Sequence, residues 1–285
     1  MSPLRQKFID EMQLRNFSPR TISSYTEAMA ALSRHFAKSP EKISEEEIKK
    51  YLLHMTQVKK LSWSSCNIAV SAFRFFYSHI LENAELALKI PARKMPKRLP
   101  EVLSTEEVER VLSVVRNPKH RIFLATVYAT GLRVSEAVKL KVDDIDGDRG
   151  TIHVRYGKGR KERYTILSKS LRKELTGYYK LYRPSEWLFY GKNLDVPIAK
   201  ETGQRVYSAA KKKAGITKPG GIHTLRHSFA THMLEMGVDL KTLQIILGHS
   251  NLKTTSLYLH VTTKHLGNVR SPLDLLNVPD FDDFV

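Results

Sequence analysis

One ten-residue segment, PARKMPKRLP at positions 91–100, constrains the fold of this 285-residue chain more than any other. Its three prolines disfavour a helix, and together with its four basic residues they predict an extended, positively charged connector. A chain of this length can form two packed domains. We therefore expect domains at residues 1–90 and 101–263, a basic linker at 91–100 and a C-terminal tail at 264–285.

Residues 1–90 have the spacing of a small helical bundle. Between Ser18 and Phe36 apolar residues recur at three- and four-residue steps, with Ser18 placed to cap the helix and Pro19 at its first position. A second helix is predicted from Ser44, which can form a capping box with Glu47. The expected buried faces are Ile48, Tyr51, Leu52 and Met55 in the second helix and, in a third after Ser62, Ile68, Phe73, Phe76, Tyr77 and Ile80.

Residues 101–263 combine helices with one strand signal. Ser104 and Glu107 repeat the capping-box pattern and predict a new helix. Polar and apolar residues alternate in Thr151–Tyr156 and Glu162–Leu167, around the turn sequence GKGRK, which predicts a β-hairpin. Helical spacing returns around Arg205–Ala214, His223–Met236, Leu240–Leu247 and Thr254–His260, with Gly237 and Gly248 at helix ends. The predicted fold is mainly α with a small β-hairpin.

Composition points to a basic protein of the cytoplasm. The chain has 47 Lys and Arg against 29 Asp and Glu, a formal net charge of +18, which favours phosphate-rich partners, although ribosomal and membrane-surface proteins share this trait. Cys66 is the only cysteine, so an internal disulfide is impossible, and we expect a small buried side chain in a reducing compartment. No signal peptide or run of about 18 apolar residues is found, so no membrane span is expected.

Two segments place cationic side chains at predicted helix starts. In TGLRVSE, Gly131 ends an apolar helix and Arg133 begins the next, where its charge is unfavourable unless an anion is held there or Glu136 pairs with it. In HTLRH, His223 and Arg226 are three residues apart and share a helix face, a second candidate anion site. His223 and His227 also have zinc-ligand spacing, but no suitably placed acid or Cys cluster accompanies them, so no metal is expected.

Two further residues have both a structural and a chemical interpretation. His249 follows Gly248 and can be a helix cap, and Tyr258, nine residues later, can be a core aromatic residue with its hydroxyl at the rim. Taken with the preceding segments, however, these positions resemble the tyrosine recombinase, or phage-integrase, family over nearly the whole chain. The family pattern of T-G-L-R-x-S-E, a hairpin Lys, H-x-L-R-H, L-G-H and Tyr is matched by Arg133, Lys158, His223, Arg226, His249 and Tyr258.

The resemblance implies a DNA strand-transfer enzyme that forms a two-domain C-shaped DNA clamp. It implies that Arg133 and Arg226 bind the scissile phosphate, with Glu136 supporting Arg133, and that His223 and His249 add hydrogen bonds. It further implies that Tyr258 attacks the phosphate and becomes joined to the 3′ end, so that the broken strand can be rejoined without metal or ATP. Of the two histidines, His223 is the expected proton acceptor.

The resemblance also implies a leaving-group acid and a DNA-binding surface. Lys158 is expected to protonate the departing 5′ oxygen, in preference to Arg160 or Lys161, because Lys donates a proton more readily than Arg and a glycine-flanked hairpin tip can enter a minor groove. The expected DNA-binding residues are Arg93, Lys94, Lys97 and Arg98 in the linker and Arg160 and Lys161 in the hairpin.

The resemblance implies double-stranded DNA as the partner, with one half-site per protomer, a homotetramer on two sites and possible accessory proteins; folded single-stranded sites stay open as an alternative substrate. The tail at 264–285 combines apolar and acidic residues and is expected to dock on a neighbouring protomer. The segment VRSPLDLL at 269–276 is similar to the end of integron integrases. Those enzymes carry a helical insertion before the H-x-L-R-H helix, however, and residues 168–221 are too few to contain it. The length of the chain resembles that of Xer-type recombinases and of the integrases of small mobile elements. Integration, excision, transposition and resolution all stay open, as do a type IB topoisomerase-like relaxing enzyme and a non-catalytic DNA-binding module.

Overall fold

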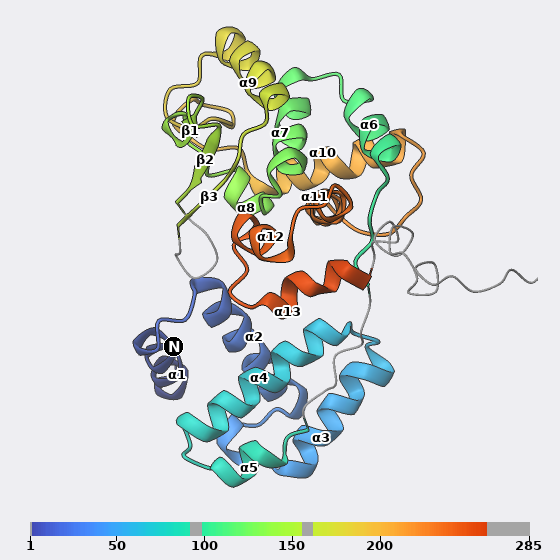
Figure 1. Cartoon of the computed structure of the whole chain (residues 1–285). Coiled ribbons are helices and arrows are strands. Elements are labelled where there is room, and N and C mark those ends of the chain that lie inside the picture. The colour runs from blue at the N-terminus through green and yellow to red at the C-terminus, as the bar shows by residue number, and fades with distance from the viewer. Residues whose placement is uncertain (1, 92–98, 156–161, 261–285) are drawn as a thin grey trace, which may run out of the picture. The chain divides into compact units, whose positions relative to one another are not determined.

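The computed structural model describes residues 2–91, 99–155 and 162–260 (Figure 1). Contacts between Cα atoms divide the chain into two compact units, Met1–Lys97 and Arg98–Val285. Helices dominate both units, and a small antiparallel sheet lies in the second. The expectation of a mainly helical chain with a small sheet is therefore confirmed.

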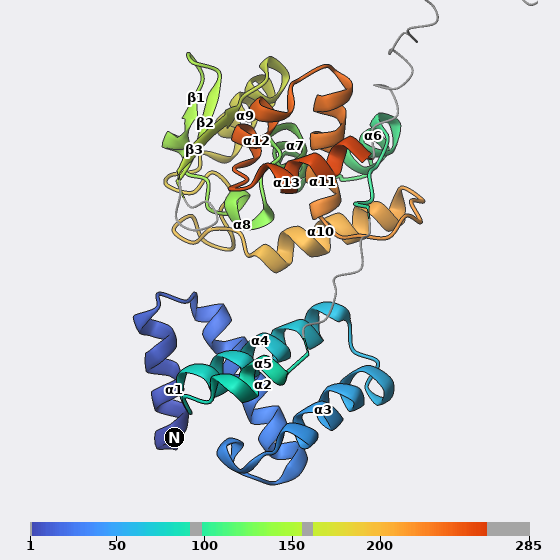
Figure 2. The same ribbon diagram turned by 60° about the horizontal axis from the view of Figure 1, so that its bottom comes forward.

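The first unit is a helical bundle (Figure 2). Its elements are α1 (Pro3–Leu14), α2 (Pro19–Phe36), η1 (Pro40–Lys42), α3 (Glu45–Leu53), the π-turn η2 (His54–Val58), α4 (Trp63–His79) and α5 (Ala84–Lys89). The predicted starts are confirmed, because the Ser18 and Ser62 hydroxyls accept amide hydrogen bonds and Ser44 forms the capping box with Glu47.

The core of this unit confirms one predicted helix face and corrects another. Ile48, Tyr51, Leu52 and Met55 are buried as expected, and so is the Cys66 thiol. Ile68, however, is 39% exposed, and α4 buries Cys66, Ala69 and Val70 instead. Ile68 precedes Phe73 by five residues, so their side chains lie about 140° apart around the helix axis, and Ile68 faces away from the core. The prediction that Ile68 is buried was wrong.

The second unit packs helices around a small sheet. Its elements are α6 (Thr105–Ser113), α7 (Pro118–Thr130), α8 (Val134–Ala137), η3 (Val142–Asp144), β1 (Ile145–Asp146), β2 (Thr151–Val154), β3 (Arg163–Ile166), α9 (Lys169–Tyr182), α10 (Lys200–Lys213), α11 (His223–Glu235), α12 (Leu240–Leu247), α13 (Leu252–Thr255) and η5 (Ser256–His260). The capping box predicted at Ser104 and Glu107 is present.

The predicted hairpin is confirmed in its strands. β2 and β3 pair antiparallel with Ile152 opposite Thr165, and β1 adds a third strand in the order β1-β2-β3. The segment 156–161, which includes the predicted turn, lies outside the described residues. Among the predicted helices, α10 begins at Lys200, before the expected start, and the last one is a short α-helix followed by the 3-10 turn η5.

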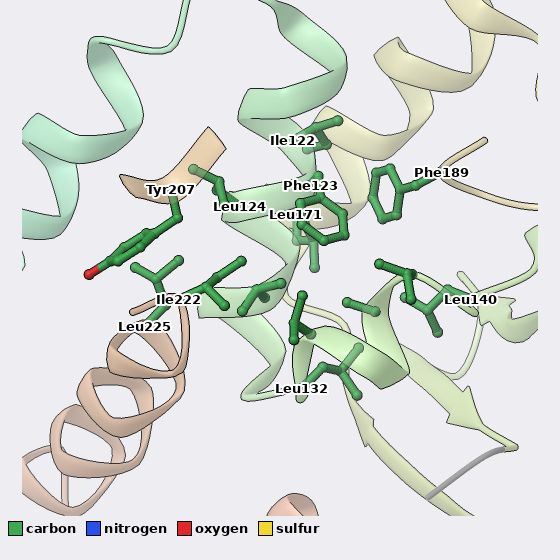
Figure 3. Close-up of a cluster of buried hydrophobic side chains, with 14 of the residues drawn as sticks. Ile122, Phe123, Leu124, Leu132, Leu140, Leu171, Phe189, Tyr207, Ile222 and Leu225 are labelled. Carbon is green, nitrogen blue, oxygen red and sulfur yellow. The ribbon is translucent and has the colours of Figure 1, made fainter. Parts of the chain in front are cut away.

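Helix α7 is the centre of the second unit, and it contacts α9, α10 and α11. Figure 3 shows Ile122, Phe123 and Leu124 of α7 among side chains that α10, α11 and the loop before α10 contribute. A neighbouring apolar cluster, composed of Phe229, Ala230, Leu234, Leu243, Ile246, Leu247 and Tyr258, joins α11, α12 and η5. The carboxyl end of α7 thus meets α8, α11 and the end of α12, where the candidate catalytic residues gather.

Candidate active site

Gly131 sets the position of Arg133. Helix α7 ends at Thr130, and Gly131 follows with a φ of 64°, a left-handed conformation that favours glycine. The chain turns there, and Arg133 becomes the N-cap residue of α8. Its backbone N–H donates to Oε2 of Glu136 at 2.8 Å, and its Nη1 donates to Oε1 of Glu136 at 2.8 Å. The predicted pairing of Arg133 with Glu136 is therefore present.

Arg226 connects three separate segments from its place in the first turn of α11. Its Nη1 donates to the carbonyl oxygen of Gly131 at 2.6 Å, and its Nη2 donates to the carbonyl oxygen of Leu247 at 2.8 Å and to Nε2 of His249 at 2.9 Å. The residue is only 3% exposed. The guanidinium therefore joins the ends of α7 and α12 to α11, in addition to any role toward a ligand.

The contacts of His249 define its tautomer. A guanidinium only donates, so Nε2 of His249 accepts from Arg226, and the ring proton lies on Nδ1. Nδ1 is 2.9 Å from the Thr255 hydroxyl and donates to it. Gly248, with a φ of 64°, ends α12 and turns the chain so that His249 faces Arg226. The predicted helix-end role of Gly248 is confirmed.

Tyr258 lies in η5 and is 3% exposed. Its hydroxyl is 3.0 Å from Nδ1 of His227, and its ring stacks on that of His249 with centroids 6.5 Å apart. His227 thus contacts the phenol, although sequence reasoning considered it only as a zinc ligand. The signal was present in HTLRH, because His227 follows Arg226 directly and lies one helical turn from His223.

His223 is the first residue of α11 and is exposed. Partial burial of its imidazole, together with the positive charges of Arg226 and Arg133, lowers its pKa, so it belongs to the same electrostatic group. The other predicted site residues cannot be placed this way. They lie outside the described residues: Lys158, Arg160, Lys161, Arg93, Lys94, Lys97, Arg98 and the tail at 264–285.

Burial shifts the acid–base properties of the cluster. It raises the pKa of Tyr258, and the charges of Arg226 and Arg133 act in the opposite direction. Burial and then the nearby charges of His223 and Arg226 lower the pKa of His227 to about 4, and burial followed by the charge of Arg226 lowers that of His249 to about 4. Both imidazoles are therefore neutral near pH 7, whereas Arg226 stays charged with a pKa of about 10.

Two family models match the chain. The phage integrase family model matches residues 101–265, and the phage integrase N-terminal SAM-like domain matches residues 4–85. This chain belongs to the phage integrase family. Its members are tyrosine recombinases, which cleave and rejoin DNA, so the chain is an enzyme of site-specific DNA recombination.

Similar proteins extend this result over nearly the whole chain. A putative integrase/recombinase of Sinorhizobium fredii is 41% identical over 98% of this chain and 91% of its own length. The tyrosine recombinase XerA of Pyrococcus horikoshii is 35% identical over 93% of this chain and 91% of its own. Among solved structures, XerH bound to difH substrate in a pre-cleavage complex has 26% identity and a TM-score of 0.68, covering 89% of this chain and 79% of that one.

The described part of the chain has two further properties relevant to the expectations above. None of its helices is both long and apolar enough to cross a membrane. In residues 2–91, 99–155 and 162–260 there is also no group of three or more His, Cys, Asp or Glu arranged to hold a metal ion.

The lowered imidazole pKa values predict a pH-dependent stability. Unfolded histidines titrate near 6.5, so between about pH 4 and 6.5 the unfolded state binds more protons and the free energy of unfolding rises with pH. Between pH 7 and 4.5 we expect His227 and His249 together to account for a loss of about 2–4 kcal/mol, allowing for the partial exposure of His249.

Urea unfolding in a Trp63→Phe background measures this loss, because Trp187 is then the only tryptophan and reports on the second unit. Adding His227→Gln or His249→Gln is expected to flatten the pH dependence between pH 7 and 4.5. An unchanged slope in both variants would contradict the prediction.

Proposed function

We propose that Tyr258 is the nucleophile of this recombinase. Its phenolic oxygen attacks the scissile phosphorus, the bond from phosphorus to the 5′ oxygen breaks, and a 3′-phosphotyrosine and a free 5′ hydroxyl result. The observation that carries the proposal is the convergence of Tyr258 with His227, Arg226 and His249. These residues come from three separate segments, namely η5, α11 and the turn after α12. The covalent bond conserves the energy of the diester, so a 5′ hydroxyl can reverse the step.

Arg133 and Arg226 are the proposed phosphate ligands. Each keeps its charge at working pH and can donate parallel hydrogen bonds to phosphate oxygens. The Arg133 side chain is 21% exposed, whereas Glu136, which orients it, is 1% exposed. His249 accepts from Arg226 in the described state, so its proposed hydrogen bond to the phosphate requires a protonated ring or a rearranged Arg226.

Two histidines are candidates for the acceptor of the Tyr258 proton. His223 is the acceptor that the family pattern implies, and it stays a prediction. His227 is favoured by its 3.0 Å contact with the phenol and by its neutral ring, which can accept through Nδ1. On either path the proton leaves the phenol as the oxygen bonds to phosphorus.

Lys158 is the proposed acid for the departing 5′ oxygen. The proposed DNA-binding residues are Arg93, Lys94, Lys97 and Arg98 in the linker and Arg160 and Lys161 near Lys158. The formal charge of +18 supports a polyanionic partner. We propose duplex DNA as this partner; the similar structure of XerH is a pre-cleavage complex with a difH substrate.

The proposed architecture is a clamp on DNA in the cytoplasm. Residues 1–90 act as the core-binding domain, 91–100 as the linker and 101–263 as the catalytic domain, with four protomers on two sites and no metal or ATP required. The tail at 264–285 is proposed to dock on a neighbouring protomer. Deleting residues 264–285 is expected to reduce assembly on DNA in sedimentation or native-gel experiments, and unchanged assembly would exclude this role.

Covalent trapping tests the central proposal. We expect the parent protein, in EDTA, to form a denaturant-resistant adduct on nicked half-site DNA from the ends of the mobile element or chromosome site that it recombines. Tyr258→Phe keeps the ring but removes the nucleophilic oxygen, so the adduct is expected to disappear while DNA affinity is retained.

Other outcomes identify the alternatives. A parent protein that relaxes supercoils without site preference acts as a type IB topoisomerase-like enzyme, and one that binds DNA but never forms an adduct is a binding module. An adduct that persists in Tyr258→Phe places the nucleophile elsewhere.

A further inference from the structure

Arg163 is a buried cation that the strand-transfer chemistry assigned above does not use. It is the first residue of β3, and its side chain is only 9% exposed. Its Nη2 and Nη1 donate to the two carboxylate oxygens of Glu136 at 2.8 and 3.1 Å, and its Nε donates to the carbonyl oxygen of Ile246 at 2.9 Å. Every one of these partners belongs to the segments that form the candidate active site.

Glu136 lies between three guanidinium groups. Its carboxylate accepts from the backbone N–H and Nη1 of Arg133 and from both terminal nitrogens of Arg163, and it lies 3.8 Å from Nη1 of Arg226. Burial alone raises the pKa of Glu136, but these hydrogen bonds and charges lower it, so the carboxylate is ionised. A buried anion therefore lies in contact with both proposed phosphate ligands.

The bidentate geometry makes Arg163 the strongest partner of that anion. Two parallel N–H···O bonds between guanidinium and carboxylate are stronger and more directional than single contacts. Arg133, by comparison, contributes one side-chain nitrogen to Glu136, and Arg226 contributes only the longer approach. If Arg163 were removed, the charge of Glu136 would act on Arg133 and Arg226 alone and would compete with a DNA phosphate for them.

Arg163 also supports the turn that carries His249. A Cβ atom placed on Gly248 would lie 2.6 Å from Cδ of Arg163, so this side chain packs directly against the Gly248 backbone. The bond from Nε to the Ile246 carbonyl ties the same side chain to the last turn of α12. One residue therefore contacts both the Glu136 carboxylate and the segment that positions His249.

We propose that Arg163 is a positioning residue for strand transfer: it neutralises Glu136, which leaves Arg133 and Arg226 available to a DNA phosphate, and it holds the turn before His249. The inference rests on the function proposed above. It also relates the hairpin to the phosphate site, because Arg163 follows Lys158 by five positions in the sequence.

The proposal predicts a change in the pH profile as well as in the rate. Burial and then the charges of Arg226, Arg133, Arg163 and His227 lower the pKa of His249. Loss of the positive charge of Arg163 leaves Glu136 uncompensated and raises the pKa values of His249 and, through the same negative field, of Tyr258. The pH midpoint of cleavage is therefore expected to move to higher pH in Arg163→Met.

The test measures the single-turnover rate of covalent adduct formation at saturating DNA, with DNA affinity and melting temperature measured in parallel. Arg163→Met is expected to reduce the cleavage rate by about 100-fold, the usual effect of disturbing an oxyanion-binding group. Adding Glu136→Gln to Arg163→Met is expected to raise the cleavage rate about tenfold and to return the pH midpoint toward that of the parent, because the uncompensated charge is then absent. Arg163→Lys is expected to keep the midpoint but to cleave at an intermediate rate, because Lys cannot form the bidentate contact.

Lys218→Met is the matched control. Lys218 donates to Glu107, which is the third helical residue of a capping box as Glu136 is, and to the carbonyl oxygen of Val102. It therefore combines the same types of contact at another place in the second unit. We expect Lys218→Met to lower the melting temperature without moving the pH midpoint.

Several results would overturn the inference. These are an Arg163→Met rate within about threefold of the parent, a double variant no faster than Arg163→Met, or a pH midpoint that does not move. If Arg163→Met alone does not fold, the cleavage rate of the double variant is compared with that of Glu136→Gln. A double variant that cleaves much more slowly than Glu136→Gln would show that Arg163 has a purely structural role. A parent protein without any adduct refutes the proposed function instead, so the two failures are distinguishable.

Discussion

Gly131→Ala is expected to lower the free energy of unfolding of the second unit by about 2–5 kcal/mol and to abolish cleavage. A left-handed conformation costs an L-residue about 1–2 kcal/mol, and forcing extra atoms into a packed core costs about 1–3 kcal/mol more. At Gly131 the φ is 64°, and an added Cβ would lie 2.5 and 2.7 Å from ring carbons of Phe229 and 2.9 Å from Leu247. These neighbours lie in α11 and α12, and the Gly131 carbonyl accepts from Arg226, so any adjustment displaces the site.

Gly215→Ala is the matched control for this substitution. Gly215 has a φ of 69°, and no atom of the described residues lies within 4 Å of its Cβ position. Only the backbone cost of about 1–2 kcal/mol is therefore expected. Urea unfolding followed through Trp187 in the Trp63→Phe background measures both variants, and equal losses would contradict the role assigned to Phe229 and Leu247.

Arg226→Lys is expected to reduce the rate of adduct formation by about 1,000-fold and the free energy of unfolding by about 2–4 kcal/mol. A lysine keeps the charge but not the fork of donors that reaches Gly131, Leu247 and His249 at the same time. The two effects have one cause, because the same guanidinium connects these segments and faces the proposed phosphate site.

Arg121→Lys is the control for this second substitution. The Arg121 side chain is 52% exposed, and its guanidinium lies 3.7 Å from Glu174. An exposed pair of this kind contributes at most about 1 kcal/mol, so neither rate nor stability is expected to change appreciably. Single-turnover cleavage and chemical unfolding decide the outcome, and an Arg226→Lys rate within about tenfold of the parent would show that charge alone is sufficient.

The helix starts were predictable because their determinants are local. Ser18, Ser44, Ser62 and Ser104 cap helices through hydrogen bonds to residues three positions ahead, an interaction that sequence spacing displays directly. The same applies to the strands of the hairpin. β1 was not predicted, since two residues carry no periodicity, and Ile68 was misassigned because an apolar residue type does not specify a helix face.

The sequence alone determined the residue types of the site and their order along the chain. TGLRVSE, HTLRH and the pair His249 and Tyr258 identify the family, because strand transfer at a phosphate requires fixed cations and a nucleophile. Only the tertiary structure decided which groups touch. His227 rather than His223 contacts the phenol, and Arg163 reaches Glu136 across 27 positions and Ile246 across 83. Contacts of this kind depend on how α8, α11, α12 and β3 pack together, and packing between distant segments leaves no spacing in the sequence from which it can be predicted.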